Sequence, residues 1–482
     1  MKSVALVSTS LLLASISTAI AIPSGNINSR WLKKDTKSGP PASVADHGGD
    51  HDDYLVVLAD NETRPWNKIF ADMGWNTTES VSTLSNDNGI VGYRSFKTES
   101  GSNIKTFGSN MRAFTVSMKK SQGVSMQSLP NVAIMEKNYK RKWAVMPRRS
   151  NHQARDLRSR SPLYKRQNLG NQTSTFIEQS TAPWNLQRVS SKNAAAASQK
   201  QVVDLAYKYR FDSVAGMGVD VYLVDSGFNI EHTDFGGRAK VIFSPSEDGG
   251  RDNNGHGTHT SGTVGSLTYG VAKKVNIFGA KAGDEAPTDS AIVAGLDRAL
   301  SLHLERMNQT GFMGSVISMS LGGPDLGQAL FSVLQRAMQA GMHVSIAAGN
   351  DNKDACTDFP GAFSQQMPLI NVGATDINDA RATFSNFGPC VDIHAPGVGI
   401  VSTWKDGPTS IEAIDGTSMA CPAVTGMIAY ELALNPQFKL DPQGMKQHIL
   451  SKALPNSIRG AENVPDGGKV LLNNGFPGDP LR

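Results

Sequence analysis

From Thr181 onward, apolar runs that fit buried strands alternate with runs that fit helices, and this alternation restricts the fold more than any other feature. The strand-like runs lie at 219–224, 316–320, 343–347 and 369–372. The helix-like runs lie at 289–307, 327–340 and 423–434, and a last helix opens at Asp441-Pro442. Strands that are separated by helices pair in parallel, with helices on both faces of the sheet. We therefore predict an α/β fold, a three-layer sandwich with a mainly parallel central sheet.

Four polar residues lie where such a sheet gathers its chemistry, at strand ends and helix starts. In chain order they are Asp225, His256, Asn350 and Ser418. Ser418 precedes a helical run, where free backbone N–H groups favour a developing negative charge. Taken singly, each residue has an ordinary explanation as a turn or helix-cap residue. Taken together, they supply an orienting acid, a base, an oxyanion donor and a nucleophile.

Two metal sites compete with this interpretation. His256 and His259 have the His-x-x-His spacing of zinc ligands, but no Glu lies between them and the sequence holds no third ligand motif. A His/Asp run at 46–53 could also hold a metal, although such runs are more often solvated linkers. Acid–base chemistry is therefore the better interpretation.

The N-terminus has the pattern of a secretion signal. Lys2 precedes an apolar run from Val4 to Ile20, and Ala19-Ile20-Ala21 has the small-x-small form of a cleavage site, which predicts a signal peptide over 1–21. No later apolar stretch reaches the ~18 residues that span a membrane. We expect a secreted protein with no membrane association after signal removal, and a vacuolar location as the alternative. Four Asn-x-Thr sequons fit this route as glycosylation sites: Asn61, Asn76, Asn171 and Asn308.

Composition divides the remaining chain into segments. Residues 22–53 are polar, and residues 54–138 hold enough strand-like and helix-like runs for one small α+β domain. Residues 139–166 hold ten Lys/Arg and one acidic residue, which predicts a disordered basic linker that is removed by proteolysis. In residues 167–482, 23 Lys/Arg stand against 30 Asp/Glu, a net charge of −7. An acidic main domain argues against nucleic-acid binding.

The three cysteines leave one without a partner inside the chain. Cys421 lies three residues beyond Ser418, within the predicted helix, so we expect it to be buried and free. Cys356 and Cys390 are then expected to form a disulfide, which closes a loop and stabilises the fold by ~3–4 kcal/mol in the chain-entropy model.

The order Asp, His, Ser along the chain is that of the subtilisin triad. With its flanking motifs, the region from about Thr181 to Ile458 resembles the subtilase family, in particular the secreted proteinase K and cerevisin group. Residues 54–138 resemble the inhibitory propeptide of that family. The motifs that carry the resemblance are Val224-Asp225-Ser226-Gly227, Asn254-Gly255-His256-Gly257-Thr258-His259, Ser318-Met319-Ser320-Leu321-Gly322-Gly323, Ala347-Ala348-Gly349-Asn350 and Gly416-Thr417-Ser418-Met419-Ala420.

The resemblance implies a role for each polar residue. Ser418 attacks the scissile carbonyl, His256 takes its proton, and Asp225 holds the imidazole. Asn350 and the backbone N–H of Ser418 form the oxyanion hole. The implied activity is that of a subtilisin-like serine endopeptidase, made as a zymogen, that works through an acyl-enzyme and needs no cofactor for catalysis. Its expected partners are protein or peptide substrates and its own propeptide, and we expect a monomer.

The resemblance also implies how substrate binds. Ser320, Leu321 and Gly322 pair with the substrate backbone, and the segments 320–323 and 347–350, which include Gly349, line the side-chain pocket. Because these segments are small and uncharged, we predict broad cleavage after large apolar or aromatic residues. A protease that cuts after basic pairs would need acidic pocket residues and usually an added β-rich domain. A catalytically dead binding scaffold is the alternative from another class, against which the complete triad argues.

Two further features follow from the resemblance. Cys356 and Cys390 match a disulfide of cerevisin-like proteins. The carbonyls of Pro368 and Ile370, with the Asp392 carboxylate, match a calcium site of the proteinase K group, and hard oxygen ligands suit Ca²⁺.

The chain also departs from the family at two places. It has Cys421-Pro422-Ala423 where most relatives have Ser-Pro-His, which predicts neutral helix packing or, as the sharper alternative, a site for mercurials near Ser418. Its basic linker is long and ends in Lys165-Arg166. We therefore expect maturation in two steps, self-cleavage after the propeptide and then trimming of the linker to a start near Gln167.

Overall fold

The computed structural model describes residues 51–80, 89–146, 164–167, 176–198, 200–460 and 470–476. The predicted signal peptide, residues 22–50, most of the basic linker and Asn171 lie outside the described residues. Residues from Asp50 onward form one compact unit. Below, residues 51–137 are called the N-terminal domain and the described residues from 176 onward the main domain.

A seven-stranded sheet forms the centre of the main domain, and every pairing in it is parallel. Its strands, in spatial order, are β12 (Ala239–Phe243), β13 (Asn276–Lys281), β11 (Val219–Asp225), β14 (Gly314–Met319), β16 (His343–Ala347), β17 (Ile370–Thr375) and β18 (Ile393–Pro396). The order changes direction at β11, so crossovers run to both sides of this strand. The predicted parallel sheet is confirmed.

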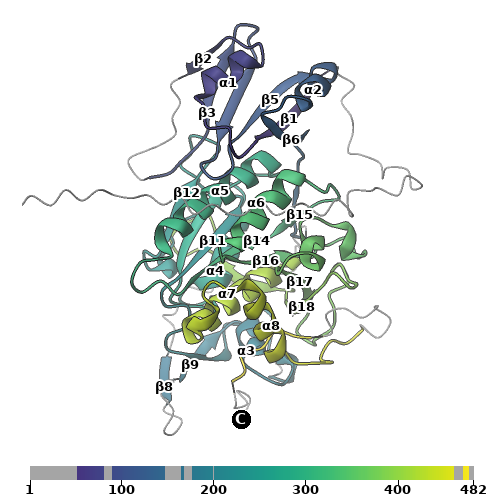
Figure 1. Ribbon diagram of the computed structural model, residues 1–482. Coiled ribbons are helices and arrows are strands. Elements are labelled where there is room, and N and C mark those ends of the chain that lie inside the picture. Colours follow the sequence, from purple (N-terminus) through teal and green to yellow (C-terminus); the bar gives the residue numbers. More distant parts are fainter. Residues whose placement is uncertain are drawn as a thin grey trace, which may run out of the picture. The chain divides into compact units, whose positions relative to one another are not determined.

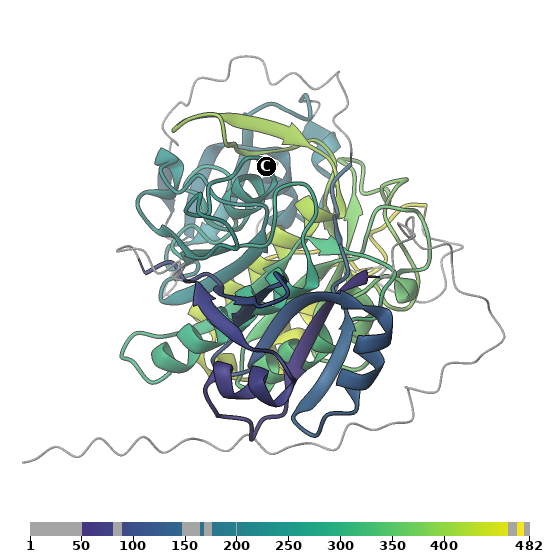
Figure 2. The same ribbon diagram turned by 90° about the horizontal axis from the view of Figure 1, so that it is seen from above.

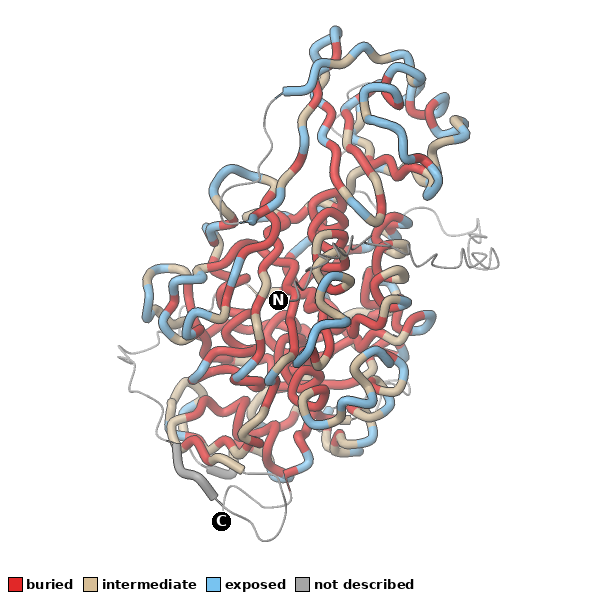
Figure 3. Tube along the Cα trace, turned by 60° about the vertical axis from the view of Figure 1, so that its left-hand side comes forward, coloured by how far each residue is buried: buried red, intermediate tan, exposed pale blue. Residues whose placement is uncertain are grey.

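Helices cover both faces of this sheet (Figure 1). One face carries α4 (His256–Gly265), α7 (Thr417–Leu434) and α8 (Pro442–Lys452), and the other carries α5 (Asp289–Arg306) and α6 (Gln328–Gln339). Side chains of β11 alternate between the two cores: Val221 and Leu223 pack with α4 and α7, whereas Tyr222 packs with α5 and α6. Every residue of β11, β14, β16 and β17 is buried, and the tube is red there in Figure 3. The four central strands of the three-layer sandwich are therefore buried on both faces, as is typical of parallel sheets.

Smaller elements complete the main domain. They are the short helix α3 (Trp184–Val189), the strands β15 (Leu321–Gly322), β19 (Ile400–Thr403) and β20 (Ile411–Ile414), and the 3₁₀ turns η2 (Ala195–Ser198), η3 (Thr233–Phe235), η4 (Ala355–Thr357), η5 (Gly361–Gln365) and η6 (Pro436–Phe438). The disulfide Cys356–Cys390 is present, with Cα atoms 5.2 Å apart, and Cys421 is free and buried. Both cysteine predictions are confirmed.

The N-terminal domain is an antiparallel six-stranded sheet with two helices (Figure 2). Its elements are β1 (His51–Leu58), α1 (Trp66–Asp72), β2 (Thr77–Ser80), β3 (Arg94–Thr98), β4 (Asn103–Phe107), β5 (Ala113–Lys119), α2 (Lys120–Gln127) and β6 (Val132–Lys137). Alternate residues of β1 face opposite ways. Val56 packs under α1 and α2, whereas Leu55 and Val57 join the core that contains α5 and α6. The face of this sheet that does not carry α1 and α2 is therefore buried against the main domain.

The described parts of the predicted basic linker are ordered by pairing. Residues 140–146, here called the cleft strand, include β7 (Lys142–Trp143), which pairs antiparallel with β15. Residues 164–167 form β8 (Tyr164–Gln167), the edge of a three-stranded sheet with β9 (Phe176–Ala182) and β10 (Tyr207–Asp212). Lys165-Arg166 thus lies in a strand, and a disordered linker is wrong for both stretches. Basic composition predicted solvation, but backbone hydrogen bonds across the pairing outweigh it.

Candidate active site

Asp225 and His256 meet at the centre of the sheet's carboxyl edge. Asp225 is the last residue of β11 and His256 the first of α4, and both are buried. The His256 Nδ1 lies 2.6 Å from Asp225 Oδ1, and Thr260 Oγ1 donates to Asp225 Oδ2 at 2.9 Å. The Ser226 backbone N–H also donates to Oδ1. With Nδ1 held by a carboxylate, the imidazole presents Nε2 to the cleft.

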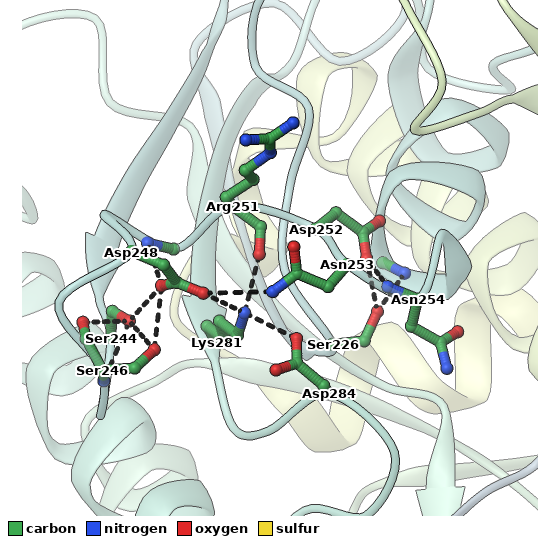
Figure 4. A network of polar contacts seen from close by, with 12 residues as sticks. Ser226, Ser244, Ser246, Asp248, Arg251, Asp252, Asn253, Asn254, Lys281 and Asp284 are labelled. Atoms are coloured by element: carbon green, nitrogen blue, oxygen red, sulfur yellow. Dashed lines mark hydrogen bonds and ion pairs between the residues drawn. The ribbon is translucent and has the colours of Figure 1, made fainter.

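Asp252 fixes the loop that leads into α4 (Figure 4). Its Oδ1 accepts from Ser226 Oγ at 2.9 Å and from the Gly255 N–H at 2.7 Å, and its Oδ2 accepts from Thr258 N and Oγ1. One buried carboxylate therefore ties the turn after Asp225 to the start of the helix that carries His256. Asp252 is a positioning residue, which the sequence motifs did not single out.

Lys281 holds the other half of the same loop (Figure 4). Lys281 is the residue of β13 that pairs with Asp225 of β11. Its buried ammonium contacts Asp248 Oδ2 at 2.5 Å, Asp284 Oδ1 at 2.7 Å and the Arg251 carbonyl at 2.7 Å. This ion pair lowers the pKa of Asp248 against the effect of burial. The contacts join the loop before His256 to the segment 282–288, which lines the cleft.

Ser418 is the second residue of α7 and is completely buried. Its Oγ donates to the Ser320 carbonyl at 3.0 Å. His256 Nε2 is buried and has no hydrogen-bond partner among the described residues. The serine–histidine bond is thus not formed, and a rotation of the Ser418 side chain is needed to form it. Nucleophile–base contacts are often loose until substrate is engaged for reaction.

The Ser418 backbone N–H donates to the carbonyl of Ala144, at 2.9 Å. Asn350 lies beside this contact: its Oδ1 accepts from Thr417 N and Oγ1, which leaves its Nδ2 buried and without a partner among the described residues. A Cβ on Gly416 would lie 2.6 Å from the Ala144 oxygen, so only glycine admits this approach. One of the two predicted oxyanion donors, the Ser418 N–H, therefore binds a peptide carbonyl of the same chain, while the other, the Asn350 amide, makes no hydrogen bond among the described residues.

The cleft strand lies in the site as an extended peptide. Trp143 pairs with Leu321 and Lys142 with Gly322, and the Ala144 N–H donates to the Ser320 carbonyl at 3.0 Å. On its other side, the Arg141 N–H donates to the Pro287 carbonyl at 2.8 Å. The three predicted backbone-binding residues are therefore brought together on one strand.

Trp143 covers His256, the predicted base. Its ring stacks on His256 with centroids 5.4 Å apart, and its Nε1 donates to the Asp284 carbonyl. Beyond Ala144, the Met146 N–H donates to the Asp415 carbonyl, so backbone contacts with the main domain continue past Ala144. This occupation was missed because a basic stretch gives no sign of a bound strand.

An acidic residue lies behind the predicted side-chain pocket. A Cβ on Gly322 would lie 2.3 Å from Asp358 Oδ1, and one on Gly349 would lie 3.1 Å from Asp358 Oδ2. Burial raises the pKa of Asp358, and Lys353, with its Nζ 3.2 Å away, opposes this shift. The two pocket segments are small and uncharged, as the sequence indicated, but a carboxylate neutralised by a lysine stands against both.

The residues proposed for calcium do not fit that ion as they stand. The Asp392 carboxylate accepts the Asn371 N–H at 2.8 Å and forms an ion pair with Lys446 at 2.8 Å. The same ammonium also binds the Leu369 carbonyl, at 2.8 Å, between Pro368 and Ile370. A lysine cation therefore takes the place among these oxygens that calcium would need.

Zinc at His256 and His259 receives no support from the geometry. His259 Nε2 lies 2.9 Å from the Ile400 carbonyl, and burial lowers the pKa of His259 to about 3. Within the described ranges, no three His, Cys, Asp or Glu residues are grouped so as to hold a metal. Of the predicted glycosylation sites, Asn61, Asn76 and Asn308 are exposed, as attachment would require.

Cys421 lies on the core side of α7. Its Sγ is 3.7 Å from the Met319 carbonyl and from Ser345 Oγ, and burial raises its pKa. Ala423 is also fully buried. Both residues fill space between α7 and the sheet, which favours the packing interpretation of Cys421-Pro422-Ala423 over a reactive thiol.

Comparison with known proteins agrees with this geometry. The model of the subtilase family matches residues 216–476, which hold all four candidate residues. The chain belongs to the subtilase family. The sequence-based assignment is confirmed.

This subtilase is 40% identical to Alkaline protease 2 of Aspergillus fumigatus over 296 residues, 58% of this chain and 57% of that protein. It is 43% identical over 266 residues to Subtilisin-like proteinase Spm1 of Pyricularia oryzae, 53% of this chain and 47% of the other. The matches span less than two thirds of these relatives' length. Among solved structures, a cold adapted subtilisin-like serine proteinase is similar with a TM-score of 0.52 and 35% identity, covering 61% of this subtilase and 99% of that chain.

Proposed function

We propose that the chain is a serine endopeptidase made as a secreted zymogen. The observation that carries this proposal is the peptide group of Ala144, whose carbonyl accepts the Ser418 N–H beside the unpartnered Asn350 amide. A dead scaffold would need neither a buried unpartnered donor nor a free imidazole nitrogen. A buried polar atom without a partner calls for an explanation, and the role of acid–base group for His256 Nε2 and of oxyanion donor for Asn350 Nδ2 supplies one.

The chemistry follows from the contacts. Ser418 Oγ leaves the Ser320 carbonyl, gives its proton to His256 Nε2 and bonds to the substrate carbonyl carbon. Asp225 stabilises the imidazolium that forms. The charge on the carbonyl oxygen is stabilised by the Ser418 N–H and the Asn350 amide. His256 then protonates the leaving amine, and water hydrolyses the acyl-enzyme by the reverse sequence.

The first substrate is the chain itself, and the bond cut is Ala144–Val145. Ala144 is the residue whose carbonyl lies in the oxyanion site, and the cleft strand pairs with β15 as a substrate would. The N-terminal domain then stays bound as an inhibitor, because its remaining contacts do not depend on that bond. Trimming of the linker near Gln167 follows as a second step.

Two of these remaining contacts are made by carboxylates, a buried one at Asp297 and a partly exposed one at Glu136. Asp297 of α5 accepts backbone N–H groups of Ser109, Asn110 and Met111. Glu136 of the N-terminal domain accepts the first two N–H groups of α6. Carboxylates at such N–H groups form strong charge-assisted bonds.

The side-chain preference stays a prediction of broad cleavage after large apolar or aromatic residues. Lys353 neutralises Asp358, which keeps the pocket from attracting a cation. The alternative, cleavage after basic residues, has one supporting observation in Asp358 itself.

No helix among the described residues is long and apolar enough to cross a membrane.

The test is purification of the full chain and of its Ser418→Ala variant. The wild type should yield a fragment that begins at Val145, before or together with one that begins near Gln167, and should hydrolyse casein until a serine-directed covalent inhibitor is added. Ser418→Ala should remain uncut and inactive. Casein hydrolysis that survives Ser418→Ala would reject the proposal. A peptide library read by mass spectrometry then separates apolar from basic preference.

A further inference from the structure

Arg141 is a fully buried arginine in a strand that otherwise looks like a surface linker. Neither its side chain nor that of Asp289 is exposed. The guanidinium meets the carboxylate with two parallel bonds, Nε to Oδ1 and Nη2 to Oδ2, each 2.7 Å long. Its Nη1 donates to the Asp325 carbonyl. A two-pronged pair of this kind fixes both charge and orientation.

The site around the guanidinium is built by the main domain. Asp289 is the first residue of α5, where the helix dipole supports a negative charge. A Cβ on Gly327 would lie 2.6 Å from Arg141 Nη2, and one on Gly323 would lie 3.4 Å from its Cδ. Two glycines therefore leave the room that the arginine fills. Burial raises the pKa of Asp289, and Arg141 opposes that shift.

Arg141 lies at a fixed position relative to the Ala144–Val145 bond, the one proposed to be cut by Ser418. The carbonyl of Ala144 lies on the Ser418 N–H, so Arg141 is the fourth residue before the bond that would be cut. The Arg141 N–H is bound to the Pro287 carbonyl and the Ala144 N–H to the Ser320 carbonyl, which fixes the register at both ends. Any substrate bound in this register places its own fourth residue against Asp289.

We propose that Asp289 makes the mature enzyme select substrates with arginine at the fourth position before the cleaved bond. This inference rests on the proposed endopeptidase function. Lysine would bind less well, because a single ammonium cannot form the parallel pair. An uncharged residue would leave the carboxylate without its partner. The competing explanation is that the pair only docks the N-terminal domain, in which case peptides would show no preference.

The experiment uses mature enzyme from the full chain and quenched fluorescent peptides that copy residues 139–148. The peptides differ only at the position of Arg141, which is arginine, lysine or citrulline, an uncharged side chain of the same shape. The wild type should cleave the arginine peptide with kcat/KM about 10- to 100-fold above the citrulline peptide, since charge-assisted bonds to a buried carboxylate are lost. The lysine peptide should fall between.

Two variants assign the effect to one carboxylate. In Asp289→Asn, the ratio between the arginine and citrulline peptides should fall to about one. In Asp325→Asn, the ratio should persist, because Asp325 contacts the guanidinium through its backbone carbonyl, which the substitution leaves in place. If Asp289→Asn fails to mature, the wild-type ratio alone decides.

Each outcome has one meaning. Equal cleavage of the arginine and citrulline peptides by wild type would overturn the inference and leave the protease standing. The inference would also be overturned if Asp325→Asn abolished the ratio as fully as Asp289→Asn. The negative charge of the whole region, and not the pair with Asp289, would then select arginine. No cleavage of any peptide or of casein would reject the proposed function instead.

Discussion

Asp297 offers a direct measure of how the N-terminal domain is held. Its carboxylate accepts the N–H groups of Ser109 at 2.6 Å, Asn110 at 3.0 Å and Met111 at 2.7 Å. Asp297→Asn keeps the shape of the side chain but replaces one acceptor oxygen by an NH2 group. At least one of the three backbone donors then faces another donor and stays unsatisfied.

The size of the effect follows from that single donor. An unsatisfied buried N–H costs about 1–3 kcal/mol, which corresponds to a rise of about 5- to 160-fold in an inhibition constant. Burial raises the pKa of Asp297, so the charge itself carries a desolvation cost that asparagine avoids. The two effects oppose each other, and we therefore expect a rise of about tenfold rather than the upper limit.

The assay adds residues 51–144 as a separate chain to mature enzyme and follows peptide hydrolysis. Because the substitution is in the main domain, any free energy that the added chain needs to fold is the same in both measurements and cancels. Ser301→Ala is the matched control: it removes one of the two acceptors of Asn110 Nδ2, at 2.9 Å, leaves the other, the Asp297 carbonyl at 3.2 Å, and should raise the constant by less. Uninhibited hydrolysis should be unchanged in both variants. Equal inhibition of wild type and Asp297→Asn would refute the reasoning.

Three other predictions concern catalysis and stability. Asn350→Ala should lower kcat by ~10²–10³ with little change in KM, measured by steady-state kinetics, because it removes a donor to the oxyanion; an unchanged kcat would exclude that role. Burial lowers the pKa of His259 to about 3 and of His343 to about 4, so below pH ~6.5 the unfolded chain takes up protons that the folded chain does not. The free energy of unfolding should thus fall from pH ~6.5 to 4, by up to about 2.7 kcal/mol per pH unit, and a flat denaturant profile would contradict this. Lys446→Met should strand the Asp392 carboxylate and cost about 3 kcal/mol of stability, while a strong calcium chelator should leave the wild-type half-life unchanged; a shortened half-life would favour calcium instead.

The positions of the candidate catalytic residues in the fold could be predicted because their signals are local. Asp225 follows an apolar strand run, and Ser418 precedes a helical run, so a parallel sheet with this alternation must bring them to one edge. The structure places His256 at the start of α4, in hydrogen-bond contact with Asp225. The residues that tune these groups were harder to find. Asp252 lies in a polar loop, and nothing in its neighbours shows that five donor groups converge on it.

The contacts that the sequence did not reveal are those whose two partners are distant in sequence. Arg141 and Asp289 are 148 positions apart, and composition alone made the first a linker residue. Asp392 has the charge of a calcium ligand, but Lys446 of α8 supplies the cation. Asp358 is hidden behind glycines that are themselves uncharged. In each case a tertiary contact decides the role of a charged side chain, and no local pattern records that contact.

The pairing of Arg141 with Asp289 has a consequence for how such a chain can evolve. In the proposed maturation, one partner is discarded and the other remains, yet a single polypeptide encodes both. A change at position 289 that redirects the enzyme to new substrates would also weaken the first cut that releases it. We therefore expect the two positions to vary together among related chains, so that a new preference appears only with a matching propeptide.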